Sequence, residues 1–259
     1  MKYVLVTGAC INTGVAIVEK FASEGYHVVF TGRRGENVAE AERQYREKFP
    51  NVNVYGYVLD SMTEDGEVDQ ASARAMFLDM DRRGVTLHTL VLNAADQGLG
   101  MKIFENPLSD FVRVLNTNMV WNYLLCELAA ARMKQNGGGS IVFVNSNTAY
   151  RAIPDRIAYS ASKSGQLGMM RAMALDLGKY NIRVNAVLPG MIRTDRWEKN
   201  PEFYKNVPSR FTPLGDVANG SDIADAAWYF AEMARNATGA ELTVDGGNTI
   251  QLYPIIPEK

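Results

Sequence analysis

Cysteine and histidine are scarce in this chain, with two residues of each among 259. Cys10 and Cys126 form no spacing pattern, which argues against a disulfide framework and favours free thiols in a reducing compartment. His27 and His88 have no partner at the spacing of metal ligands, so we expect no metal site.

Long apolar runs and an excess of one charge are also absent. No segment approaches the roughly 20 apolar residues of a membrane span. The apolar stretch Tyr3–Val6 is too short for a secretory signal, and Thr7-Gly8 interrupts it. The formal net charge is −2 with both signs mixed along the chain, so we expect neither a nucleic-acid partner nor a membrane surface. These absences predict a cytoplasmic protein.

Short apolar runs alternate with helical stretches along the whole chain, and 47% of the residues are hydrophobic, which is ample for a core. We expect strands at 3–6, 27–31, 52–59, 89–92, 141–144, 182–188 and 241–244, and helices at 15–21, 36–48, 63–83, 108–134, after Tyr159, and 222–235. This alternation predicts an α/β fold with a doubly wound parallel sheet covered on both faces. With no repeat or domain boundary, we predict one domain over residues 1–259.

A polar stretch near the C-terminus lacks helical or strand periodicity. Residues 193–213 contain three prolines, Pro201, Pro208 and Pro213. We expect residues 191–213 to form a lid over the site.

The loop after the first expected strand contains glycines at two positions. It reads Thr7-Gly8-Ala9-Cys10-Ile11-Asn12-Thr13-Gly14 and opens an amphipathic helix. Glycines let a backbone approach a pyrophosphate, and a helix N-terminus offers free N–H groups. Asn12 stands where a middle glycine would, and asparagine enters the left-handed region readily. The alternative is a tight turn without a ligand, but the position between strand and helix favours phosphate binding.

The second expected strand ends in Thr31-Gly32-Arg33-Arg34. NAD enzymes usually have an acid here for the ribose 2′-hydroxyl, whereas an arginine suits the 2′-phosphate of NADP. Gly32 would leave room, and Arg33 would supply a planar cationic fork. Two solvated arginines in a surface turn are the alternative, but the missing acid favours NADP(H) over NAD(H).

Three residues of the segment 146–163 form a candidate catalytic group. Ser146 follows the apolar run 141–144, while Tyr159 and Lys163 are four apart, on one face of the expected helix. A free tyrosine has a pKa of about 10, and a nearby ammonium would lower it toward neutrality. Tyr159 would transfer a proton, Lys163 would tune it, and Ser146 would orient a substrate oxygen. A Tyr-x-x-x-Lys pair alone also occurs by chance in many helices.

Several polar residues lie at expected strand ends. Ligands of doubly wound sheets bind beyond the carboxyl ends of the strands. The residues at these ends are Thr7, Arg33, Asp60, Asn93 and Ser146.

Together these motifs resemble the single-domain branch of the short-chain dehydrogenase/reductase family, from Tyr3 to about Asn248. The loop 7–14 resembles its Thr-Gly-x-x-x-Gly-x-Gly motif, and Asn93-Ala94-Ala95 resembles its Asn-Ala-Gly motif. Val244-Asp245-Gly246-Gly247 resembles the C-terminal signature. The residues that match the catalytic tetrad are Asn118, Ser146, Tyr159 and Lys163.

The resemblance implies a Rossmann-type domain and hydride transfer between a nicotinamide and an alcohol or ketone carbon of a small-molecule substrate. It also implies that Lys163 holds the nicotinamide ribose and that Asn118 keeps a helix kink and a relay water. A homotetramer is the usual state of the family. The implied cofactor contacts are Thr7, Gly8, Asn12, Thr13, Gly14, Arg33, Arg34, Asp60, Asn93, Ala94, Tyr159, Lys163, Pro189, Gly190, Ile192 and Thr194.

Two departures and two alternatives stay open. Asn12 replaces the middle glycine of the cofactor loop, and Ala95 replaces the glycine after Asn93-Ala94. One alternative is a 3-oxoacyl-carrier-protein reductase, whose acidic carrier needs a basic patch. The other is a non-catalytic NADP-binding sensor, which we would expect to lack Tyr159 or Lys163. The candidates for the basic patch are Arg132, Lys134 and Lys179.

Overall fold

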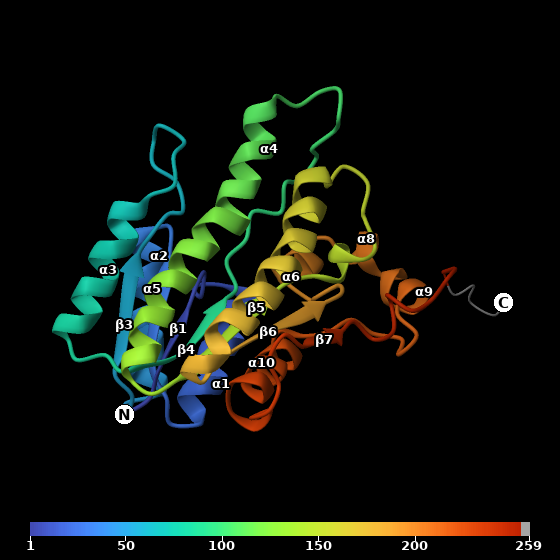
Figure 1. Ribbon diagram of the computed structural model, residues 1–259. Coiled ribbons are helices and arrows are strands. Elements are labelled where there is room, and N and C mark those ends of the chain that lie inside the picture. Colours follow the sequence, from blue (N-terminus) through green and yellow to red (C-terminus); the bar gives the residue numbers. More distant parts are fainter. Residues whose placement is uncertain (255–259) are drawn as a thin grey trace.

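Seven parallel strands form the centre of the fold, in the order β3-β2-β1-β4-β5-β6-β7 (Figure 1). The computed structural model describes residues 1–254, apart from the side chains at positions 203 and 209, so the end of the expected domain 1–259 lies outside the described residues. The strands are β1 (Tyr3–Val6), β2 (His27–Gly32), β3 (Val54–Val58), β4 (Leu87–Leu92), β5 (Gly139–Val144), β6 (Ile182–Pro189) and β7 (Glu241–Val244).

Successive residues of a strand point to opposite faces of the sheet. Both faces are apolar here, so helices pack against each of them. In β1, Leu5 belongs to one apolar core and Val4 and Val6 to the other. The first core is closed by α3 (Gln70–Arg82), α5 (Trp121–Gln135) and α6 (Ile157–Leu177). The second is closed by α1 (Asn12–Ser23), α2 (Gly35–Lys48) and α10 (Gly220–Trp228). The expected doubly wound, Rossmann-type sheet in a single domain is therefore confirmed.

The helix expected at 63–83 begins seven residues later, at Gln70. Before it, Thr63 and Glu67 form a local turn in which Gly66 has a φ of 82°, a conformation that a helix cannot continue. Asp69 then caps α3 by accepting a hydrogen bond from the backbone N–H of Ser72. The polar residues 63–69 are compatible with a helix, but the positive φ of Gly66 interrupts the helical backbone there.

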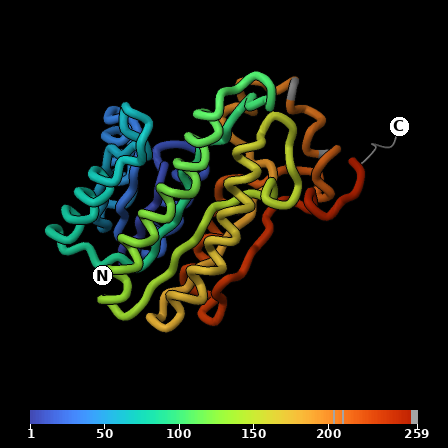
Figure 2. The backbone as a smooth tube through the Cα atoms, turned by 45° about the horizontal axis from the view of Figure 1, so that its top comes forward, coloured from blue at the N-terminus to red at the C-terminus, as the bar shows by residue number. Residues whose placement is uncertain are grey.

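The helix expected at 108–134 is continuous but changes its hydrogen bonding in the middle. It comprises α4 (Leu108–Leu115), the π-helical turn η1 (Asn116–Val120) and α5. The helix expected at 222–235 begins two residues earlier, as α10, and also ends in a π-helical turn, η4 (Tyr229–Met233). Figure 2 shows the α4–η1–α5 rod running beside α6.

The expected lid contains three short helices rather than irregular chain. They are α7 (Asp195–Lys199), α8 (Pro201–Tyr204) and α9 (Val207–Phe211). Proline stands in the first turn of α8 and α9, where its missing N–H costs nothing. The segment is joined to the body where the backbone of Arg193 donates to Ala218 and that of Ala218 donates to Met191.

The strand order reverses beside β1, which has β2 on one side and β4 on the other. Sheets of this type bind ligands at such a point, beyond the carboxyl ends of the strands. Within residues 1–254, no helix is both long and apolar enough to cross a membrane, and no group of three or more His, Cys, Asp and Glu side chains could hold a metal ion.

Candidate active site

Ser146 lies just beyond the carboxyl end of β5 and is 8% exposed. It begins the 3₁₀ turn η2 (Asn147–Ala149), where its Oγ accepts from the backbone N–H of Thr148 at 3.1 Å. The same hydroxyl donates to Thr148 Oγ1 at 2.8 Å. These two bonds fix the hydroxyl at the edge of the sheet.

Tyr159 and Lys163 lie on successive turns of α6, as the spacing predicts. Lys163 is 2% exposed, and its Nζ donates to the backbone oxygen of Val144, the last residue of β5, at 2.9 Å. Nζ also lies 5.6 Å from the centroid of the Tyr159 ring. The strand end and the helix thus bring all three residues of the candidate group together.

The pKa values of the pair are both displaced by burial. Burial raises the pKa of Tyr159, while hydrogen bonding to Ser146 and the charge of Arg156 oppose that rise. Burial lowers the pKa of Lys163 to about 7. The sequence predicted a lowered pKa for the tyrosine. The structure gives the opposite direction for this pKa, because the loss of water around the phenol outweighs the Ser146 hydrogen bond and the charge of Arg156.

Asn118 lies in η1 and is completely buried. Its Nδ2 donates to the Asp96 backbone oxygen at 2.8 Å and to Ser162 Oγ at 2.9 Å. Its Oδ1 accepts from the Asp96 backbone N–H at 2.8 Å. The side chain therefore joins the loop after β4 to α6.

The backbone oxygen of Asn118 accepts from two side chains, Gln166 Nε2 at 2.6 Å and Asn122 Nδ2 at 2.9 Å. Side chains that take over a backbone acceptor explain a π-helical turn at this place. Asn145 Nδ2 in turn donates to Gln166 Oε1 at 3.0 Å and to the Lys163 backbone oxygen at 2.9 Å. Gln166 and Asn145 were not predicted from the sequence, since α6 has no clear apolar face that would indicate a buried glutamine.

The loop 7–14 has the shape that a phosphate needs. Gly8 and Asn12 have φ values of 66° and 50°, so Asn12 does adopt the left-handed conformation that suits asparagine. A Cβ at Gly14 would lie 2.4 Å from the Gly8 backbone oxygen, so only glycine fits there. The first turn of α1 contains no acidic residue, and the N-cap residue Ile11 makes no side-chain cap bond. The helix N-terminus is thus available to an anion, and the loop fits a dinucleotide.

Thr7 and Asn93 join the ends of β1 and β4. Thr7 Oγ1 accepts from the backbone N–H groups of Asn93 and Ala94 at 2.9 and 3.0 Å. Asn93 Nδ2 donates to the backbone oxygens of Thr7 and Gly8 at 3.0 and 3.1 Å. Through these bonds Thr7 and Asn93 fix the start of the loop 7–14 relative to the end of β4.

Arg33 and Arg34 are exposed after β2, and neither has an acidic partner among the described residues. The expectation that Gly32 leaves room for a ligand is wrong. A Cβ there would lie 2.4 Å from Cys10 Sγ and 2.8 Å from Val38 Cγ2, so packing against these two side chains fills the space.

The remaining predicted contacts lie at the same edge of the sheet. Asp60 follows β3 and accepts from the Ser61 backbone N–H at 2.7 Å. Pro189 ends β6, and the Gly190 backbone N–H donates to the Val244 oxygen at 3.1 Å. Ile192 pairs with Ala218 in an isolated bridge. Two further predicted contacts begin helices: Thr13 in the first turn of α1 and Thr194 before α7.

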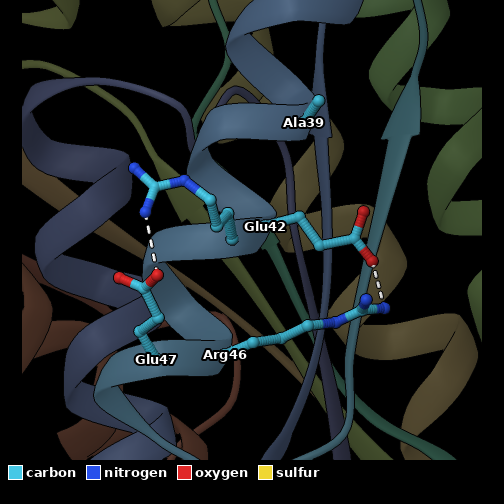
Figure 3. Close-up of a pocket in the computed structure, with 5 residues that line it drawn as sticks. Ala39, Glu42, Arg46 and Glu47 are labelled. Carbon is cyan, nitrogen blue, oxygen red and sulfur yellow. Dashed lines mark hydrogen bonds and ion pairs between the residues drawn. The ribbon is translucent and has the colours of Figure 1, made fainter.

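A shallow hollow of about 430 Å³ lies elsewhere, along α2 (Figure 3). Its charged lining is already paired, Arg46 with Glu42 and Arg43 with Glu47. It lacks the polar residues of the carboxyl edge, so we do not assign the site to it.

A Rossmann-type sheet with a glycine loop after β1 and a Ser–Tyr–Lys group at its carboxyl edge defines the class of protein. A family model described as enoyl-(acyl carrier protein) reductase matches residues 8–249. The chain belongs to the short-chain dehydrogenase/reductase family of oxidoreductases.

Characterised relatives cover nearly the whole chain. A 3alpha-hydroxysteroid dehydrogenase of Mediterraneibacter gnavus is 32% identical over 95% of this chain and 96% of its own length. The structure of L-sorbose reductase from Gluconobacter frateurii, complexed with NADPH and L-sorbose, has a TM-score of 0.87 at 26% identity and covers 97% of both chains. An NAD+-bound xylitol dehydrogenase has a TM-score of 0.83 at 27% identity, over 95% of this chain and 98% of that one.

Proposed function

We propose that this chain is an NADP(H)-dependent carbonyl reductase or alcohol dehydrogenase that acts on a small or medium-sized substrate. The observation that supports this most directly is the convergence of Ser146, Tyr159 and Lys163 beyond the carboxyl end of β5. The named relatives act on CH–OH groups of a steroid and of polyols, which agrees with this reaction type.

The bound nicotinamide supplies or accepts the hydride, and residues of this chain handle the proton. Ser146 Oγ holds the substrate oxygen, and the Tyr159 hydroxyl gives its proton to that oxygen during reduction. Tyr159 is protonated near neutral pH and so has a proton to give, and the Ser146 hydrogen bond and the charge of Arg156 favour its release against the effect of burial. Lys163 would hold the ribose, and Asn118 would keep the η1 turn in place.

The cofactor preference rests on Arg33 and Arg34. The structural neighbours are mixed, since one title names NADPH and another NAD+. Two unpaired guanidinium groups after β2, with no acid in their place, favour a 2′-phosphate. We also propose that the other predicted residues contact the cofactor and that residues 191–213 form a lid over the site.

The carrier-protein alternative gains no support from the basic residues suggested for it. Arg132 is engaged by Asp81 at 2.6 Å, and Lys134 and Lys179 lie over the ring of Tyr180. These residues precede β5 and β6, at the amino ends of the strands, whereas the candidate site is at the carboxyl ends. We further propose a cytoplasmic location and a homotetramer.

The first test is NADPH and NADH consumption against keto sugars, 3-oxoacyl thioesters, ketosteroids and small diketones. We expect turnover with NADPH on one class. Tyr159→Phe should reduce turnover by about 100-fold or more while NADPH affinity, measured by fluorescence titration, stays within about twofold. Unchanged turnover in this variant would remove Tyr159 from proton transfer, and NADPH binding without turnover on any compound would favour the sensor.

A further inference from the structure

Two arginines from different segments, Arg156 and Arg196, bond to the same residue, Gln97. Arg156 immediately precedes α6, and its Nη1 donates to the backbone oxygen of Gln97 at 3.3 Å. Arg196 lies in α7 of the lid, and its Nη1 donates to Gln97 Oε1 at 3.5 Å. The loop after β4, the start of α6 and the lid therefore come together around one glutamine.

Neither guanidinium has an acidic partner within residues 1–254. Neighbouring arginines do: Arg113 is paired with Asp96, and Arg193 is paired with Asp216 at 2.6 Å. Burial lowers the pKa of Arg156, and the charge of Arg196 adds to that lowering. Two like charges held near each other repel, and an anion between them would relieve this repulsion.

Arg156 and Arg196 lie near the tyrosine that a substrate oxygen would meet. Arg156 is three residues before Tyr159, and its charge acts on the tyrosine hydroxyl. Because Arg156 shares Gln97 with Arg196, a substrate whose oxygen meets Tyr159 and Ser146 has both guanidinium groups nearby.

We propose that Arg156 and Arg196 bind an ionised carboxylate or phosphate group of the substrate, with Gln97 holding the two guanidinium groups in place. The natural substrate is then an oxo or hydroxy acid, or a phosphorylated ketone or alcohol. Planar guanidinium forks match both oxyanions and give the strongest class of hydrogen bond. This inference rests on the proposed function, because it describes the substrate of the same site.

The test uses substrate pairs that differ in one ionised group. Two carboxylate arms compare levulinate with methyl levulinate and 3-oxocholanate with its methyl ester, and a phosphate arm compares dihydroxyacetone phosphate with dihydroxyacetone. For the arm that matches, kcat/KM with NADPH should be about 10- to 100-fold higher for the ionised member. The matching arm distinguishes a carboxylate from a phosphate.

Variants then assign the effect to the two arginines. Arg156→Gln and Arg196→Gln should each lower kcat/KM for the ionised member by about tenfold or more and change the neutral member by less than about threefold. Arg156→Lys should recover part of the loss. Arg193→Gln is the matched control, since it removes a lid arginine that is already paired. Melting temperatures verify that each variant is folded.

Three results would overturn the proposal. Equal use of ionised and neutral members in every arm would show that no oxyanion is bound. Equal losses on both members of a pair, with a displaced pH profile, would show that Arg156 instead tunes Tyr159. A loss of NADPH affinity as the main effect of Arg196→Gln would place that side chain on the cofactor.

A binding measurement separates this proposal from the proposed function. Calorimetric titration of the NADP+-loaded protein with levulinate, 3-oxocholanate and dihydroxyacetone phosphate needs no turnover. Binding that is weakened tenfold in Arg156→Gln and kept in Arg193→Gln would support the oxyanion site even if no compound were reduced. Absence of binding in the wild type, together with turnover of neutral ketones, would overturn the site and leave the reductase intact.

Discussion

The side chain of Lys163 is almost completely buried, and the only described hydrogen bond of its Nζ goes to a neutral backbone oxygen. A buried cation without a counter-charge opposes folding. The residue that we place at the centre of the chemistry is therefore a source of instability in the free protein, as functional residues often are.

The first residue-scale prediction concerns the stability of Lys163→Met. The pKa of Lys163 falls from the ordinary 10.5 to about 7, so between these values the unfolded chain binds more protons and stability rises with pH. Methionine removes this titration. We expect the variant to be more stable near pH 7 by up to about 4 kcal/mol, since each pKa unit between about 7 and 10.5 corresponds to about 1.4 kcal/mol, with turnover abolished.

Urea unfolding of both proteins from pH 6 to pH 10 gives the necessary comparison. The difference in unfolding free energy between the two proteins should be largest below about pH 7, where Lys163 is charged in the folded state. It should close as the pH approaches 10.5. A gap that is independent of pH would show that burial of the charge is not its cause.

The second residue-scale prediction concerns cofactor choice. Arg33→Ala should weaken NADPH binding by about 10- to 100-fold and NADH binding by less than about threefold, because only NADPH has the 2′-phosphate. Fluorescence titration with both cofactors measures this. Arg43→Ala is a suitable control, since Arg43 is already paired with Glu40 and Glu47 on α2. Equal losses for both cofactors would contradict a 2′-phosphate contact.

At the scale of elements, η1, the end of β5 and α6 are held together by amide side chains. Gln166 is 1% exposed and bridges Asn118 and Asn145. Through these bonds it fixes the π-helical turn and the segment that leads to Ser146. Gln166 thus holds in place the segments that carry the proposed catalytic groups.

We therefore expect Gln166→Leu to lower kcat by about tenfold while KM changes little, because the substrate pocket is intact and the proton-transfer geometry is loosened. Gln166→Glu, which keeps one acceptor but loses the donor to Asn118, should behave similarly. Ser164→Ala, two residues earlier on α6 and with its hydroxyl bonded to the Ala149 oxygen, serves as control. Losses confined to thermal stability would assign Gln166 a purely structural role.

Local periodicity was sufficient to predict the seven strands and most helices, because the central strands are apolar on both faces in a doubly covered sheet. Predictions from the sequence were wrong where a single residue sets the local structure. Gly66 interrupts the helix expected before α3, and the space beside Gly32 is filled by Cys10. The triplet Ser146, Tyr159 and Lys163 was found because its members are close in sequence. Arg156, Arg196 and Gln97 come together only through tertiary contacts, so no spacing could indicate them.

At the scale of the whole molecule, one helical surface is unusually apolar. Large apolar side chains lie at steps of four, eight and three residues along α4, η1 and α5, and burial of these exposed side chains is expected only in an assembly. They are Leu108, Val112, Val120 and Tyr123, exposed by 76%, 43%, 48% and 55%. This surface supports the proposed homotetramer.

The corresponding prediction is that Val112→Glu combined with Tyr123→Glu converts the tetramer to a smaller species, because charges would be buried at the contact. Light scattering coupled to size-exclusion chromatography gives the mass. Leu78→Glu, at an equally exposed leucine on α3, should leave the mass unchanged. A monomeric wild type would rule out this assembly.

The strand order also bears on how the protein is made. Counted along the chain, β2 and β3 extend the sheet on one side of β1, and β4 to β7 extend it on the other. Every strand is thus added at a free edge, and none has to enter between two strands that are already paired. A ribosome that delivers the chain from its N-terminus can complete the cofactor loop first and the Ser–Tyr–Lys segment later, without any paired strands having to separate.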